Sequence, residues 1–114
     1  MNRYAAAGII ADAKDGKHVV VLSINGRDSR CAFAEVAHHA KDADRVHRAN
    51  GAERIDFTGG GQITFHRGVD SLRGTSADII YLNGDAERHI HNTDQWSAVQ
   101  AAIATASTPQ IIRA

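Results

Sequence analysis

The stretch that decides the fold is Arg73–His89, which reads RGTSADIIYLNGDAERH. Its centre, DIIYL, is a short continuous apolar run, and such runs are typical of strands that are buried on both faces. A second run of this kind, KHVVVLSI, covers residues 17–24 and is rich in β-branched side chains. Two buried strands of this type predict a layered sheet with at least partly parallel pairing.

Amphipathic segments alternate with these strands. Residues 2–15 predict a first helix, which Asn2 can cap. Between the two strands, apolar side chains recur at helical spacing over residues 33–40, and Asp28 or Ser29 is expected to cap that second helix. Helices that separate buried strands in this way supply the crossover connections that parallel pairing needs.

The middle of the chain has a different pattern. Short, partly alternating segments between residues 45 and 67 are separated by Asn50-Gly51 and by Gly59-Gly60-Gly61. Both separators are hairpin signals, because glycine tolerates the positive φ of tight turns. We therefore expect antiparallel strands here, as an insertion or an extended edge of the sheet.

The C-terminal part predicts one more helix and one more strand. Thr93 or Asp94 can start the helix, Pro109 is expected to stop it, and QIIRA at residues 110–114 resembles a terminal strand. The order helix, strand, helix, antiparallel strands, strand, helix, strand predicts a single α/β domain over residues 1–114.

The composition is that of an ordinary soluble chain. Apolar residues make up 43% and charged residues 23% of the 114 residues, and the formal net charge is zero, so no overall basic field favours nucleic acid. A single cysteine, Cys31, excludes an internal disulfide and fits a reducing cytosol, and a small packed thiol is its simplest interpretation. No apolar run approaches the roughly 18 residues of a membrane span, so we expect a cytoplasmic protein without membrane contact.

Several segments together resemble one family. GKHVVVLSINGRDSRCAFAEVAHHA at residues 16–40 is similar to a strand and helix of phage terminase large subunits and related helicase-like P-loop NTPases. Ser71, Arg73 and Gly74 match a polar segment of that family, and Asp78–Leu82 match its Walker B strand. The resemblance implies a partial RecA-like (P-loop NTPase-like) layered sheet with a hairpin section, from which the central P-loop strand is missing.

The chain departs from the family at the residues that perform hydrolysis. The resemblance places the Walker B acidic pair at Asn83 and Gly84, which are a poor magnesium ligand and no base. No segment of the sequence has the glycines and the Lys-Ser/Thr that cradle phosphates in a P-loop. Without these groups the transition state of ATP hydrolysis is not stabilised, so we expect no ATPase activity, no catalytic residue and no cofactor.

The missing strand also bears on assembly and partners. A sheet that lacks a central strand exposes edges, so we expect a homo-oligomer, in which strands can be exchanged, encoded by a phage or prophage and present in the host cytoplasm. The expected function is that of a non-catalytic binding module for nucleic acid or for a host or viral protein. The candidate contacts are arginines, which grip phosphate bidentately: Arg27, Arg30, Arg67, Arg73 and Arg88.

Two alternatives remain open. The first is a small metal-dependent hydrolase or nuclease that uses His89 and His91 with Asp85 and Glu87, because a His-x-His pair on a strand places both rings on one face. The sequence favours polar loop residues over a metal site, since no third ligand stands at a recognised spacing. The second alternative is a decaying fragment without activity of its own.

Overall fold

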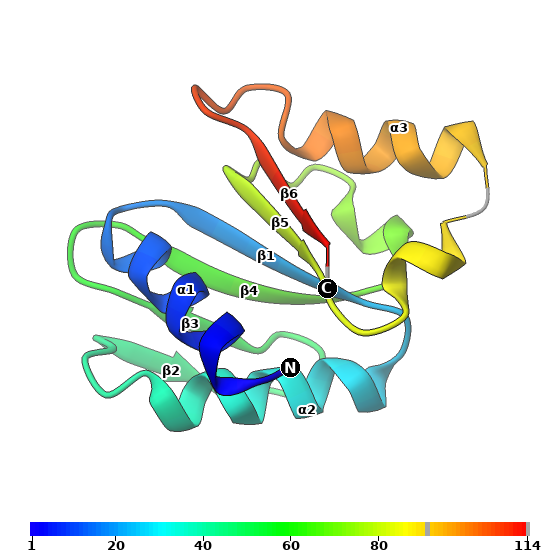
Figure 1. The fold of residues 1–114 in the computed structure, drawn as a ribbon. Coiled ribbons are helices and arrows are strands. Elements are labelled where there is room, and N and C mark those ends of the chain that lie inside the picture. The colour runs from blue at the N-terminus through cyan, green and yellow to red at the C-terminus, as the bar shows by residue number, and fades with distance from the viewer. Residues whose placement is uncertain (91, 114) are drawn as a thin grey trace.

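The structure is a computed structural model that describes residues 1–90 and 92–113. Within these ranges, three α-helices and a six-stranded mixed sheet form an α/β fold (Figure 1). The helices are α1 (Arg3–Lys14), α2 (Gly26–His39) and α3 (Thr93–Ala102). The strands are β1 (His18–Ser23), β2 (Arg45–His47), β3 (Arg54–Asp56), β4 (Gln62–Arg67), β5 (Ile79–Leu82) and β6 (Gln110–Arg113). Two short 3-10 helices, η1 (Val69–Leu72) and η2 (Ala86–His89), follow β4 and β5.

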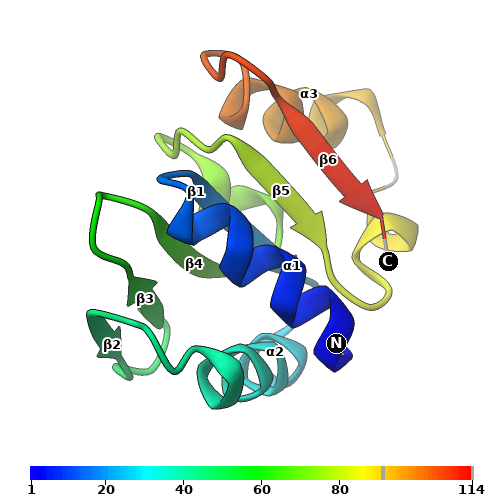
Figure 2. The ribbon, with the colours of Figure 1, turned by 60° about the vertical axis from the view of Figure 1, so that its left-hand side comes forward.

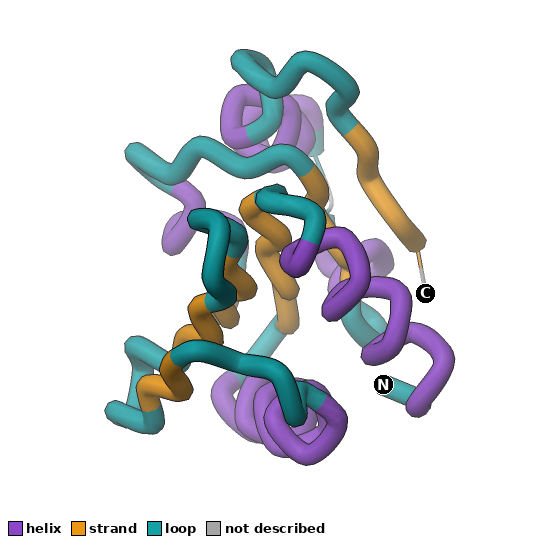
Figure 3. The backbone as a smooth tube through the Cα atoms, turned by 90° about the vertical axis from the view of Figure 1, so that its left-hand side faces the viewer, coloured by secondary structure: helices purple, strands orange, loops and turns teal. Residues whose placement is uncertain are grey.

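The sheet has the order β2-β3-β4-β1-β5-β6. β4, β1, β5 and β6 are parallel to one another, whereas β2, β3 and β4 pair antiparallel. The expected combination of parallel strands with an antiparallel hairpin section is therefore confirmed. The hairpin strands lie at one end of the sheet and β6 at the other (Figure 3).

Both faces of β1 and β5 are buried, which explains the continuous apolar sequences of these two strands. On one face, α1 and α2 pack over a core that includes Val19, Val21 and Phe65. On the opposite face, α3, η1 and η2 pack over Val20 and Leu22 (Figure 2). The described residues contain no helix both long and apolar enough to cross a membrane.

The second face changes character over β3 and β4. There β4 presents Gln62, Thr64 and His66, which are only partly buried, while its alternate residues point into the core. On β3, Arg54 lies directly opposite Thr64 in the antiparallel register. This part of the sheet is polar, and we refer to its β4 side chains and Arg54 as the polar sheet face.

Asn2 caps α1 and α3 begins at Thr93, both as expected, whereas the cap of α2 and the end of α3 differ from those expected. Asn25 caps α2, and its Oδ1 accepts a hydrogen bond from the Asp28 N–H at 2.8 Å, so Asp28 and Ser29 lie inside the first turn. Asn92 caps α3 in the same way. α3 ends at Ala102, well before Pro109, because the chain has to reverse to bring β6 beside β5. Asparagine, serine and aspartate are comparable caps, so their neighbourhood in the sequence left the choice undecided.

A glycine sets how α1 rests on the sheet. Gly61 is buried just before β4, and a Cβ on it would overlap the carbonyl group of Ala13 near the end of α1. Gly16, at φ 93°, turns the chain from α1 toward β1 beside this contact. The close approach of the two backbones is therefore possible only with glycine at position 61.

Candidate functional site

The carboxyl ends of the parallel strands meet at one edge of the sheet. Ser23 of β1 is in register with Arg67 of β4, and Leu22 with Leu82 of β5. The chain leaves β1 toward α2 on one face, whereas it leaves β4 and β5 toward η1 and η2 on the other. In open α/β sheets, connections that diverge in this way leave a place for a ligand outside the strand ends.

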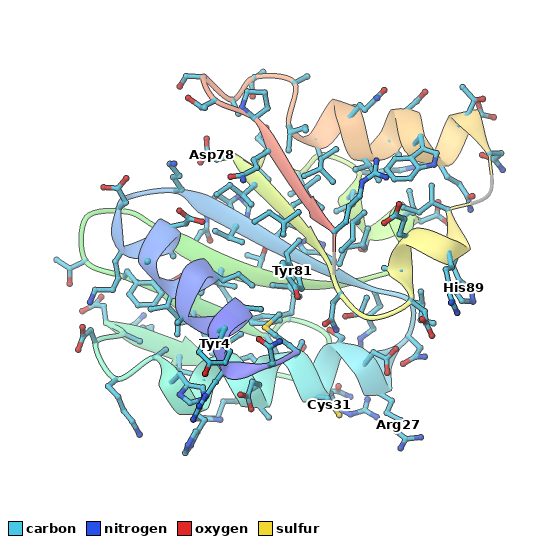
Figure 4. All side chains as sticks on the ribbon, in the orientation of Figure 1. Tyr4, Arg27, Cys31, Asp78, Tyr81 and His89 are labelled. Atoms are coloured by element: carbon cyan, nitrogen blue, oxygen red, sulfur yellow. The ribbon has the colours of Figure 1, made fainter. Side chains whose placement is uncertain are left out.

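Two arginines converge at this edge. A Cβ on Gly26, the first residue of α2, would lie 2.8 Å from Nη1 of Arg67 and 3.1 Å from Nη1 of Arg30. The guanidinium groups of Arg30 and Arg67 are therefore neighbours above the N-terminus of α2. Arg27 is exposed on the same helix end and extends away from the sheet (Figure 4).

A fourth arginine, Arg48, lies against an aromatic pair that connects α2 to β4. Phe33 of α2 stacks edge-on against Phe65 of β4, with ring centroids 5.2 Å apart. The Cζ atom of Arg48 lies 5.7 Å from the centroid of the Phe33 ring, a cation–π distance. We call Arg27, Arg30, Arg48 and Arg67 the arginine cluster.

The arginine cluster has few neutralising partners. Arg67 donates to Oδ1 of Asn50 at 3.0 Å and lies 3.9 Å from the carboxylate of Glu53, whose side chain is buried. Within residues 1–90 and 92–113, the other three arginines form no ion pair. Asp28 contributes one carboxylate in the first turn of α2. A local excess of positive charge therefore exists on a chain whose net charge is zero, and the α2 N-terminus adds to it.

The two positions matched to the Walker B pair have structural roles. Asn83 is only 4% exposed, and its Nδ2 donates to Ser23 Oγ at 3.0 Å and to the carbonyl oxygen of Asp28 at 3.5 Å. It thereby joins the end of β5 to the end of β1 and to the start of α2. Gly84 has a φ of 59°, in the left-handed region that favours glycine. The sequence shows the residue types but not these contacts.

The remaining candidate arginines lie on other elements, with neighbours of their own. Arg73 follows η1 and lines a groove with Asp94 and Gln95, beside α3. Arg88, in η2, lies 3.7 Å from the carboxylate of Asp85. Arg48, which is not among the five candidate contacts, belongs to the cluster through its contact with Phe33.

The structure does not give His89 the strand placement that the metal-site alternative needs, and it agrees with the favoured interpretation of polar residues beyond the strand end. That residue lies in η2 rather than on a strand, and its Nδ1 donates to the backbone carbonyl of Asp85 at 3.0 Å. Glu87 pairs with Arg113 at 2.7 Å, and His91 lies outside the described residues. Among the residues that are described, no group of three His, Cys, Asp or Glu side chains could hold a metal ion. A site that depends on His91 stays a prediction.

Cys31 is exposed, so the expectation of a packed thiol is wrong. The buried side of α2 is formed by Ser29, Ala32, Phe33 and Val36, which turns position 31 to the outside (Figure 4). Its place beside the helix N-terminus does not bring it into the core.

An open groove of about 480 Å³ adjoins the arginine cluster. Arg67 belongs to both, and the polar sheet face contributes Arg54, Thr64 and His66 to the groove, with Ser71 of η1 at its rim. No protein-family model matches this chain, and no curated protein matches it significantly.

Proposed function

We propose that the protein is a non-hydrolysing, self-associating binding module that holds nucleic-acid phosphates at the arginine cluster. The observation that carries this proposal is the convergence of Arg30 and Arg67 above the N-terminus of α2. Like charges that lie side by side repel each other, and an anion placed between them removes that repulsion.

The chemistry of the arginine cluster favours phosphate. Guanidinium groups bind phosphate oxygens in a bidentate manner, and Arg27 and Arg30 have no carboxylate partner among the described residues that would have to be displaced. A helix N-terminus stabilises an anion further. An acidic protein segment would meet the same charges, and it is the alternative outcome of the binding test.

The expectation that the chain does not hydrolyse ATP is supported by the positions after β5. The buried amide of Asn83 donates hydrogen bonds to Ser23 and to Asp28, which is the opposite polarity from a carboxylate that binds magnesium. We extend the proposal to ancestry: the chain is a phage-type descendant of a RecA-like P-loop motor. The parallel order β4-β1-β5-β6, with a polar segment before β5, supports it.

The binding proposal is tested with the double variant Arg27→Ala/Arg30→Ala. Loss of two phosphate contacts should weaken binding to a DNA or RNA oligonucleotide about tenfold or more, and should lower the slope of log affinity against log salt by about 2. Fluorescence anisotropy over a series of salt concentrations measures both quantities. The matched control is Arg88→Ala, whose arginine is exposed and faces Asp85.

This control makes the test specific. Arg88→Ala removes one positive charge where the double variant removes two, and Arg88 is not part of the arginine cluster. This control should therefore leave the affinity for the oligonucleotide nearly unchanged. No binding by the unaltered protein, or an equal loss per charge in the control, would remove the proposal. Binding of an acidic peptide in place of nucleic acid would assign the cluster to a protein partner.

Self-association is proposed along β6. Gln110 donates its N–H to the Asp78 carbonyl on the β5 side, so the backbone groups of Ile111 and Arg113 point outward from the sheet. Within the described residues this outer edge has no pairing strand. The β6 edge of a second copy can pair with it around a twofold axis, so that the β6 edges of both copies are covered.

Replacing Ile111 by proline should abolish this association. Proline removes an N–H that points outward and leaves the hydrogen bonds to β5 in place, as is tolerated on edge strands. Ile111→Ala is the control, because it loses the same side chain but keeps the N–H. Sedimentation should show an oligomer for the unaltered protein and for Ile111→Ala, and a monomer for Ile111→Pro. A folded monomer of the unaltered protein at micromolar concentration would contradict the proposal.

A further inference from the structure

Two histidines share one hydroxyl group on the polar sheet face. Nε2 of His18, at the start of β1, lies 2.8 Å from Oγ1 of Thr64, and Nε2 of His66 lies 3.0 Å from the same oxygen. Both imidazoles are partly buried. Neither ring has a role in the proposed phosphate binding.

The other nitrogen of each ring fixes where its proton lies. Nδ1 of His18 is 2.6 Å from the carbonyl oxygen of Ser76, and Nδ1 of His66 is 3.2 Å from that of Ser71. A carbonyl oxygen can only accept, so each Nδ1 must carry hydrogen. A neutral ring of this tautomer has a lone pair on Nε2, and both lone pairs therefore face Thr64.

The hydroxyl group of Thr64 has one hydrogen to donate. If both rings are neutral, that hydrogen satisfies one Nε2, and the other Nε2 meets an oxygen lone pair. If one ring is protonated, its Nε2–H donates to Oγ1, while the hydroxyl donates to the second ring. With a single added proton, every donor of this group faces an acceptor.

A second added proton would leave the two rings both positively charged. Two imidazolium ions would then donate to one oxygen atom and repel each other across it in a partly buried place. Asp78 is the acid near His18, and its carboxylate accepts a hydrogen bond from the backbone N–H of His18 at 2.8 Å. Arg54 lies opposite Thr64, and its charge disfavours further positive charge there. Asp56 on β3 is engaged by Arg54 and His47.

We propose that His18, Thr64 and His66 form one proton-binding site, which takes a single proton between the two rings and excludes a second. Burial lowers the pKa of both histidines, and the charge of His18 lowers the pKa of His66 further, as expected when the rings do not charge together. Hydrogen bonds to the Ser76 and Ser71 carbonyls act in the opposite direction.

The site connects three parts of the fold. His18 belongs to β1, Thr64 and His66 to β4, and the two carbonyl acceptors to residues 71–76 between β4 and β5. Thr64, His66 and Ser71 also line the open groove. The contacts of the pair hold one wall of the groove, and acidification strong enough to force a second proton onto the pair should loosen that wall.

The test is an NMR titration of the imidazole nitrogens in the intact protein. His18 and His66 should respond together in two steps separated by more than about one pH unit, which is the behaviour of a coupled pair. In Thr64→Val, which keeps the shape of the side chain without the hydroxyl, the shared response should disappear.

A second measurement does not depend on resonance assignment. The unfolded chain binds a proton that the folded site excludes. The folded state therefore becomes less stable as the pH falls below the pKa of an unperturbed histidine, about 6.5. The denaturation midpoint should therefore shift downward on acidification, and by less in His66→Asn, which has one imidazole fewer. Independent single-step titration of both rings, unchanged in Thr64→Val, would overturn the proposal, as would an equal midpoint shift in His66→Asn.

Discussion

Gly61→Ala should lower the free energy of unfolding by about 3 kcal/mol or more, at the upper end of what overpacking costs. The added Cβ would overlap the Ala13 carbonyl group, which is backbone and cannot rotate away as a side chain would. Either α1 or the start of β4 has to move, and each carries part of the core beneath α1 and α2. Denaturant unfolding followed by circular dichroism measures the change.

Gly8→Ala is the matched control for that measurement. Gly8 lies within α1, and a Cβ there would meet nothing within 4 Å. Alanine is the better helix former, so this variant should gain about 0.5–1 kcal/mol. Equal stability of the Gly61→Ala and unaltered proteins would show that α1 does not rest on the sheet as described.

Asn83→Asp should lower the free energy of unfolding by about 2–4 kcal/mol at neutral pH. The change removes the two hydrogen bonds that Nδ2 donates and puts a buried carboxylate next to the Asp28 carbonyl oxygen. The loss should shrink on acidification, because a protonated carboxyl group carries no charge and can donate. Asn50→Asp, at an exposed asparagine whose Oδ1 faces Arg67, should stay within about 0.5 kcal/mol.

The same position tests the proposed absence of hydrolysis. Asn83→Asp/Gly84→Glu introduces the acidic pair of the motors that the sequence resembles, and glutamate at the positive φ of position 84 should cost about 1–2 kcal/mol more. Because no phosphate loop is present in the sequence, this variant should show no magnesium-dependent ATP turnover. Turnover by the unaltered protein, abolished in Asp85→Ala, would contradict the proposed function.

The sequence predicts best those strands that are buried on both faces. β1 and β5 are covered on both faces, so their apolar runs are unbroken, and the glycine turns around β3 identify the hairpin section. The expected cap of α2 was wrong, because Asn25 stands close to Asp28 and Ser29, which are comparable caps. What ends α3 is the reversal of the chain toward β6, a tertiary requirement that no local residue announces.

The candidate site was predictable by residue type and not by arrangement. Arg30 and Arg67 lie far apart in the sequence, and only the parallel register of β1 with β4 brings Arg67 to the start of α2. The same register places Thr64 between two histidines that the sequence separates widely. For Asn83, the sequence indicates only that the position has no carboxylate. The structure shows that its amide joins the end of β5 to the end of β1 through Ser23.

The position of β1 at the centre of the sheet has a consequence for synthesis of the chain on the ribosome. Both strands that flank β1 come later in the sequence, at residues 62–67 and 79–82. A nascent chain that ends before β5 therefore exposes an unpaired valine-rich edge of β1. Such a segment is one that chaperones recognise, and pairing at long sequence separation also slows folding. Stops or pauses in translation before β5 should thus favour aggregation over a stable smaller product.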